Sequence, residues 1–84
     1  EIEPSDSYML FTEHKDRPGM IGAVGTIIGD SGINISQMQV SLGLQRGGKA
    51  MMALCLDEPL PMECYQRILS IPDMYQALIV KLAR

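Results

Sequence analysis

The apolar residues of this 84-residue chain switch repeatedly between the spacing of a strand and the spacing of a helix, and this switching limits the fold more than any other feature. Strands show alternating or continuous apolar residues, whereas helices place them three and four residues apart. The pattern predicts, in order, a strand at Tyr8–His14, a helix at Gly19–Ser31, strands at Ile33–Leu42 and Ala50–Leu56, a helix from Pro61 that ends at Ile71–Asp73, and a strand at Ala77–Leu82. The expected order is therefore βαββαβ.

Two right-handed βαβ units joined by a hairpin form a four-stranded antiparallel sheet with both helices on one face. The hairpin turn is expected at Gln45–Lys49, which has two adjacent glycines at its centre. We therefore expect an α+β fold, specifically a ferredoxin-like two-layer sandwich.

The two middle strands differ in a way that predicts their places in the sheet. Ala50–Leu56 is apolar at every position, as expected for an interior strand. Ile33–Leu42 is more polar, and its alternation changes parity near Ser36–Gln37, which predicts an edge strand with a bulge there. Helices on one face leave the other face bare, so half of the interior strand's apolar side chains need a cover from a partner. That uncovered set is either Met51, Ala53 and Cys55 or Ala50, Met52 and Leu54.

Length and composition indicate one small domain. The chain has enough residues for one core, and 46% hydrophobic with 20% charged residues is a globular composition. Glu1–Ser7 is polar and resembles the end of a linker, so the domain is expected at residues 8–84. No apolar run reaches the roughly 18 residues of a membrane span and no secretory signal is present, so we expect a cytoplasmic domain without a membrane partner.

Charge and motif content argue against several functions. A net charge of −3 disfavours a nucleic-acid partner, and Ala50–Leu56 lacks aromatic residues on which bases stack. The glycines match no nucleotide-binding motif, and Cys55 and Cys64 match no metal-site spacing. No nucleophile is paired with a base. We expect two reduced thiols, no metal site and no catalytic activity in this chain.

The stretch His14–Gly22, between the first strand and the first helix, is the best candidate for a ligand site. It carries the only histidine of the chain together with an acid, a base, a proline and a glycine. Backbone N–H groups at the start of a helix bind anions. The amides of Gly19, Met20 and Ile21 are therefore expected to hold a carboxylate.

Three side chains add to this site. His14 and Asp16 are two residues apart and are expected to converge on one ligand, and the amide of Asn34 both donates and accepts hydrogen bonds. The combination suits a zwitterion, with Asp16 for an ammonium group, the helix amides for a carboxylate, and His14 or Asn34 for a hydroxyl. The alternative is that Asp16 and Asn34 only cap and turn the backbone and that His14 lies at the rim.

Glycines recur along the first helix. Gly22, Gly25 and Gly29 form a stripe at helical spacing, although each interior glycine costs about 1 kcal/mol relative to alanine. The stripe indicates either tight packing on the chain's own sheet or close approach of another backbone or a ligand. Gly32 is expected to end the helix.

Several motifs together resemble an ACT domain. These are D-R-P-G-M-I-G, A-V-G-T-I-I-G-D and S-G-I-N-I, which run from Asp16 to Ile35. With G-G-K-A-M-M, L-D-E-P-L-P and S-I-P-D they look most like the C-terminal regulatory domains of D-3-phosphoglycerate dehydrogenases. The resemblance covers Tyr8 to Leu82.

The resemblance implies a non-catalytic sensor that binds L-serine between two ACT domains paired side by side through the second strand and the first helix. It implies feedback control of serine biosynthesis, with NAD bound only by the catalytic part of the parent enzyme. The family's serine contacts match His14 and Asn34, whereas Asp16 departs from the asparagine of the best-known pattern. The full set of expected ligand-site residues is His14, Asp16, Arg17, Pro18, Gly19, Met20, Ile21, Asn34 and Ile35. The alternatives are the ACT domain of an iron–sulfur L-serine dehydratase and a domain that only dimerises.

Overall fold

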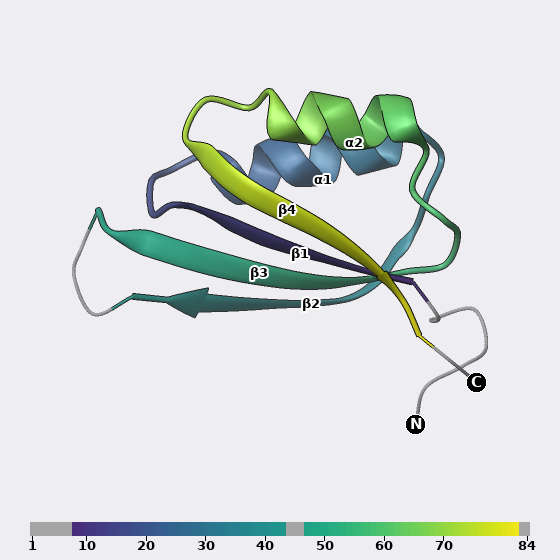
Figure 1. Ribbon diagram of the computed structural model, residues 1–84, viewed down its shortest axis with the longest axis horizontal. Coiled ribbons are helices and arrows are strands. Elements are labelled where there is room, and N and C mark those ends of the chain that lie inside the picture. The colour runs from purple at the N-terminus through teal and green to yellow at the C-terminus, as the bar shows by residue number, and fades with distance from the viewer. Residues whose placement is uncertain (1–7, 44–46, 83–84) are drawn as a thin grey trace.

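The computed structural model describes residues 8–43 and 47–82, so the predicted linker and part of the predicted hairpin turn lie outside the described residues. The elements are β1 (Tyr8–Lys15), α1 (Met20–Asp30), β2 (Ile35–Leu42), β3 (Lys49–Leu56), α2 (Met62–Leu69) and β4 (Met74–Lys81). Figure 1 shows both helices on one face of a single sheet. The predicted βαββαβ sandwich is confirmed.

The sheet has the strand order β2-β3-β1-β4, and its neighbouring strands are antiparallel. The prediction that the third strand is interior and the second lies at an edge is confirmed. The reason is visible in the connections, because each helix carries the chain across one strand before it re-enters the sheet (Figure 1).

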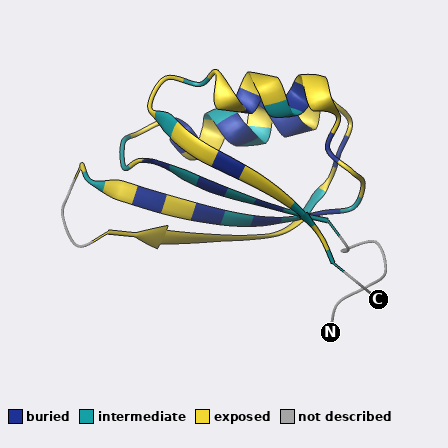
Figure 2. Cartoon of the chain, viewed as in Figure 1, coloured by how far each residue is buried: buried dark blue, intermediate teal, exposed yellow. Residues whose placement is uncertain are grey.

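The core lies between the helices and one face of the sheet. Ala50, Met52, Leu54 and Leu56 of β3 are buried against the helices, whereas Met51 is 50% exposed on the opposite face. Figure 2 shows this alternation along β3. The structure thus decides which of the two apolar sets faces the helices. Each large apolar side chain buried in this way contributes about 1.5–3 kcal/mol.

Helix α1 ends in a motif that also directs the next segment into the core. Gly32 has φ +76°, and its N–H donates to the carbonyl of Gly29 at 2.9 Å. The N–H of Ile33 donates to the carbonyl of Ile28 at 3.4 Å, which completes a Schellman motif. Gly32 therefore ends the helix as predicted. Because Ile33 belongs to this motif, β2 begins at Ile35, two residues later than the pattern indicated.

The predicted bulge in the second strand is confirmed. Ile35 pairs with Leu56 and Gln37 pairs with Cys55, so Ser36 is the extra residue. The bulge changes the phase of the strand, and Met38, Val40 and Leu42 after it lie on the same face as the buried side of β3.

Strand β4 starts at Met74, three residues before the predicted start at Ala77. Gln76 pairs with Glu13 and Met74 pairs with His14, with a register shift between them. Sequence reasoning missed this segment because it lacks a clean alternation. Pairing with β1 supplies the backbone hydrogen bonds that make it a strand.

Candidate functional site

His14 lies near the end of β1, on the face of the sheet that packs against the helices. It is almost completely buried, with 2% of its surface exposed. Its Nδ1 lies 3.3 Å from the Thr12 hydroxyl oxygen, and its neighbours across the sheet are Ala50 and Met74. Burial lowers the pKa of His14 below its usual value of 6.5; nearby Asp16 acts in the opposite direction and Arg17 adds to the lowering. The imidazole is therefore neutral at pH 7, and the alternative of a rim residue is wrong.

The start of α1 is open to an anion. Gly19 is the N-cap residue with φ +91°, and no side chain caps the helix. The N–H groups of the first turn have no partner within the helix, as at any helix start. Met20 is buried, so only its backbone is available, whereas Ile21 is 45% exposed beside it. The predicted carboxylate-binding amides are thus placed at an accessible helix N-terminus.

Asp16 and Arg17 differ in what they do. The Asp16 N–H donates to the carbonyl of Gly48 at 2.7 Å, and its carboxylate has no hydrogen bond or ion pair within residues 8–43 and 47–82. It is free to accept an ammonium group. The Arg17 guanidinium instead donates to the Asp73 carboxylate at 2.8 Å and to the Pro72 carbonyl at 2.7 Å. Arg17 therefore points to the turn between α2 and β4.

Asn34 is held through its backbone. Its N–H donates to Asp57 Oδ1 at 3.0 Å, and the N–H of Asp57 donates back to the Asn34 carbonyl at 3.2 Å. These reciprocal bonds place the exposed Asn34 just before β2 and leave its side-chain amide without a hydrogen bond in the described part of the chain. Asp57 is not among the predicted site residues, because its position just after the end of β3 gives no signal of this contact.

One chain does not bring Asn34 to the turn at His14. His14 pairs with Ala50 at one end of β3, and Ile35, next to Asn34, pairs with Leu56 at the other end. At about 3.3 Å per residue, the two ends of that strand are roughly 20 Å apart. Within one chain, Asn34 therefore lies too far from His14 to share a small ligand with it, and the expected ligand site between two paired chains stays a prediction. The cause of the separation is the direction of α1, which runs back along the sheet to the end where β1 began.

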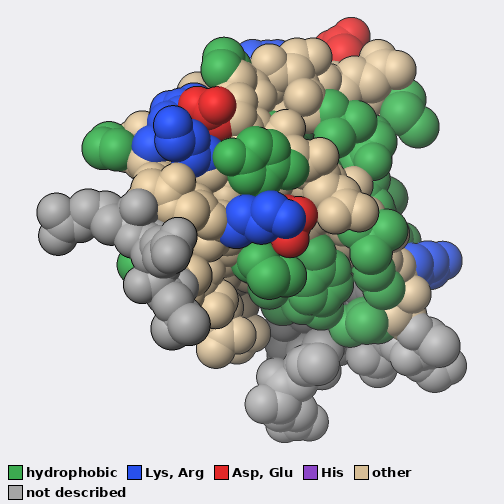
Figure 3. Space-filling model, turned by 60° about the vertical axis from the view of Figure 1, so that its left-hand side comes forward, with side chains coloured by type: hydrophobic (Ala, Val, Ile, Leu, Met, Phe, Trp, Pro, Cys, Tyr) green, Lys and Arg blue, Asp and Glu red, His purple; other side chains and the backbone are tan. Residues whose placement is uncertain are grey.

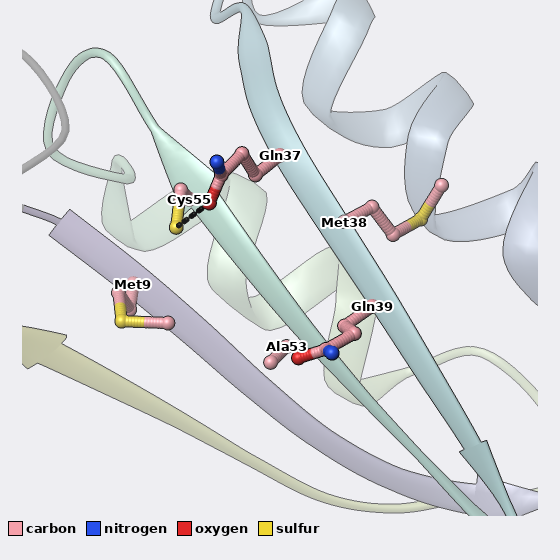
Figure 4. Close-up of a pocket in the computed structure, with 6 residues that line it drawn as sticks. All are labelled: Met9, Gln37, Met38, Gln39, Ala53 and Cys55. Atoms are coloured by element: carbon pink, nitrogen blue, oxygen red, sulfur yellow. Dashed lines mark hydrogen bonds between the residues drawn. The ribbon is translucent and has the colours of Figure 1, made fainter. Parts of the chain in front are cut away.

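Strand β2 lies at the edge of the described sheet, with β3 on one side only, and carries exposed apolar side chains. Met38, Val40 and Leu42 are 47%, 38% and 63% exposed although they lie on the helix side of the sheet. Figure 4 shows Met38 pointing away from Gln37 and Gln39, which lie toward the other face. A strand of this kind is a template for pairing with another strand.

The glycine stripe of α1 is open. A Cβ atom added at Gly22, Gly25 or Gly29 would meet no other atom within 4 Å. Tight packing on the chain's own sheet is therefore excluded as the reason for these glycines. Close approach of another backbone or a ligand stays a prediction.

The face of the sheet away from the helices is a second unoccupied surface. A shallow hollow there is lined by Met9, Gln37, Gln39, Ala53 and Cys55, and also by Met38, although the Met38 side chain points to the helix face (Figure 4). The Cys55 thiol contacts the Gln37 side-chain oxygen at 3.8 Å. Hydrophobic side chains also group around an adjacent basic and acidic side chain on the surface in Figure 3.

Both cysteines are free, and residues 8–43 and 47–82 contain no group of side chains that could hold a metal ion.

Comparison with known proteins places these features in context. Residues 8–60 match the model of the family described as "ACT domain". The chain is 44% identical over 79 residues to the D-3-phosphoglycerate dehydrogenase of Synechocystis sp. and 35% identical over 75 residues to that of Bacillus subtilis. These matches cover 94% and 89% of the chain and 14% of the length of each enzyme.

The fold also matches a solved structure. The regulatory subunit of aspartate kinase from Thermus thermophilus superimposes with a TM-score of 0.68 at 14% identity, over 86% of this chain and 48% of that one. This likeness concerns the fold alone. Within the part of the chain that the structure describes, no helix has the length and apolar character needed to cross a membrane.

Proposed function

The chain belongs to the ACT domain family, and from this premise we propose that it is a non-catalytic regulatory domain that binds L-serine as a homodimer and controls the catalytic part of a D-3-phosphoglycerate dehydrogenase. The enzymes that it resembles support this parent, since they match nearly the whole chain. The chain spans about one seventh of their length (14%), so catalysis and any bound NAD belong to the remainder of such an enzyme.

The observation that carries the proposal is that β2 is the outermost strand of the sheet and has exposed apolar side chains, so that a second sheet can be added beside it. A two-fold symmetric pair of β2 strands is antiparallel, so the Ile35 end of one strand adjoins the Leu42 end of the other. Leu42 pairs with Ala50, which in turn pairs with His14. Side-by-side pairing therefore brings Asn34 of the partner subunit to the end of the sheet that carries the His14 turn.

Each composite site provides groups for every part of a small amino acid. The N–H groups at the start of α1 bind the carboxylate, and the Asp16 carboxylate binds the ammonium group. Neutral His14 or Asn34 of the partner subunit binds the side-chain hydroxyl. Pro18, Gly19 and Ile21, together with Ile35 of the partner subunit, line the space between these groups.

Regulation follows from the position of the site at the subunit interface. A ligand that contacts both chains favours the paired arrangement in which both contacts are made. The end product of the pathway thereby changes the arrangement of the attached catalytic parts. This coupling is the feedback control that we assign to the domain.

Calorimetry of the 84-residue chain with L-serine, glycine, L-alanine and D-serine tests the proposal. We expect saturable heat with L-serine, and we expect Asn34→Ala to weaken binding by about 1–3 kcal/mol because it removes a hydrogen bond to a charged or buried group. The backbone bonds between Asn34 and Asp57 remain in this variant, so the fold is retained. Gln39→Ala, on the strand β2 that follows Asn34, is the control.

Two outcomes would contradict parts of this proposal. The absence of heat with any amino acid would leave only a dimerisation role. The replacement of the family's asparagine by Asp16 would then explain the loss of ligand binding. Unchanged affinity in both Asn34→Ala and His14→Ala would place the ligand elsewhere. The full-length gene product distinguishes the two proposed parents. A dinucleotide-binding domain in it identifies a dehydrogenase rather than an iron–sulfur L-serine dehydratase.

A further inference from the structure

The Arg17 side chain joins two turns that are far apart in the sequence. Its guanidinium donates from Nε to Asp73 Oδ2 at 2.8 Å, from Nη2 to the Pro72 carbonyl at 2.7 Å and from Nη1 to the Pro18 carbonyl at 3.0 Å. The Lys15 N–H also donates to the Asp73 carbonyl at 2.9 Å. The turn that precedes α1 is thus attached to the turn that precedes β4.

Asp73 adopts a conformation that favours glycine. Its φ is +72°, the only positive value at a non-glycine residue in the described ranges 8–43 and 47–82. The Met74 N–H donates to the Ile71 carbonyl at 3.0 Å, and Pro72 lies between them, which matches a type II turn with Asp73 at its third position. Glycine or asparagine is preferred there. An aspartate at this position is locally unfavourable, and its carboxylate is the group that pairs with Arg17.

The contact to Pro18 connects this pair to the ligand turn. The Pro18 carbonyl belongs to the peptide bond that leads into Gly19, the N-cap residue whose φ is +91°. By holding that carbonyl, Arg17 restrains the peptide plane immediately before the N–H groups of α1. Arg17 lies over Gly19, with Nη1 3.7 Å from the position of a Cβ atom there.

We propose that Arg17 and Asp73 form a clamp that holds the β1–α1 turn in its ligand-binding shape, and that Arg17 is a positioning residue that does not touch the ligand. Three of the five N–H groups of its guanidinium, one on each nitrogen, already donate to Asp73, Pro72 and Pro18 and direct the side chain to the two turns. The positive φ of Asp73 is retained because the carboxylate is needed for this contact. The inference rests on the proposed binding of L-serine, and it deepens the assignment of that site.

The test compares Arg17→Gln, Asp73→Gly and the double variant by calorimetry with L-serine and by thermal unfolding. We expect the dissociation constant to rise about tenfold in each single variant, because a charged hydrogen bond is lost, and to rise no further in the double variant. Asp73→Gly should unfold at the same temperature as the wild type or higher, since it removes an unfavourable φ. Its loss of affinity therefore does not arise from unfolding.

The matched control is Arg67→Gln, which breaks another exposed ion pair, that between Arg67 and Asp30 at 3.7 Å. It should leave the affinity for L-serine unchanged. Wild-type affinity in Asp73→Gly together with weak binding in Arg17→Gln would overturn the proposal, because Arg17 would then contact the ligand directly. Additive losses in the double variant would overturn it as well.

Hydrogen exchange separates failure of the clamp from failure of the proposed function. If the wild type binds no amino acid, the proposed function is wrong. The clamp is then tested by the hydrogen-exchange rate of the Lys15 amide, which donates to the Asp73 carbonyl. This amide should exchange faster in Arg17→Gln and in Asp73→Gly than in the wild type and in Arg67→Gln. Equal exchange rates in all four proteins would overturn the clamp.

Discussion

At the scale of single residues, the polar side chains of the proposed site differ in burial and in hydrogen-bond partners. His14 is buried and neutral, Asp16 has a carboxylate without a hydrogen bond in the described residues, and Arg17 donates hydrogen bonds to two neighbouring turns. Residue type alone indicated a role for each of these side chains. Burial and hydrogen-bond partners decide which of them is available to a ligand.

Burial of His14 makes stability depend on pH. Its pKa is lowered in the folded chain, so the unfolded chain binds the proton more tightly. The contribution of this residue is complete above the unfolded value of about 6.5 and is lost as the pH falls through that value toward the folded pKa.

Urea unfolding of the wild type and of His14→Gln between about pH 7.5 and pH 5 measures this effect. The free energy of unfolding should fall more steeply in the wild type as the pH decreases. Equal pH dependence in the two proteins would contradict the burial of a neutral imidazole.

At the scale of elements, α1 contributes both to the core and to an open surface. One side buries Met20, Val24, Ile27 and Ile28, and another presents the glycine stripe, where an added Cβ atom would meet no described atom within 4 Å beyond its chain neighbours and its own helix backbone. The helix would be more stable without these glycines, because each costs about 1 kcal/mol relative to alanine. Glycines retained on this face of α1 despite that cost are expected to let the backbone of another chain approach the helix closely.

Gly25→Ala tests this reading of the stripe. The added methyl group meets no atom within 4 Å, so the free energy of unfolding of the isolated chain should rise by about 0.5–1 kcal/mol. The dimer should become weaker, because the methyl group occupies the space of the partner backbone. Chemical denaturation and sedimentation equilibrium measure the two effects, and an equally strong dimer would show that the stripe faces solvent.

At the scale of the whole molecule, a small two-layer sandwich leaves a sheet edge and a sheet face uncovered. The edge carries Met38, Val40 and Leu42 of β2, whereas the opposite face carries Met51 and Leu78. A domain of this length has a small stability margin, and association is a common way to increase it. The edge is the surface that completes the proposed site.

Val40→Lys should therefore convert the dimer to a monomer. A lysine on an edge strand opposes pairing, and Val40 is already 38% exposed, so the fold of the chain should be unaffected. Binding of L-serine should be lost together with the dimer. Sedimentation equilibrium and calorimetry measure both, with Leu78→Lys on β4 as the control that remains a dimer. A dimeric Val40→Lys would exclude pairing through β2.

The sequence by itself determined the order of the elements, the interior place of β3, the edge position and bulge of β2 and the stop of α1 at Gly32. These features depend on apolar period and glycine conformation, which are properties of short segments. Only the tertiary structure decided which face of β3 is buried, that β4 begins at Met74, and that His14 and Asn34 lie at opposite ends of the sheet. It also paired Arg17 with Asp73 and Asn34 with Asp57. These features depend on strand register and on the direction in which each helix returns to the sheet, and both are set by packing between segments that are distant in the sequence.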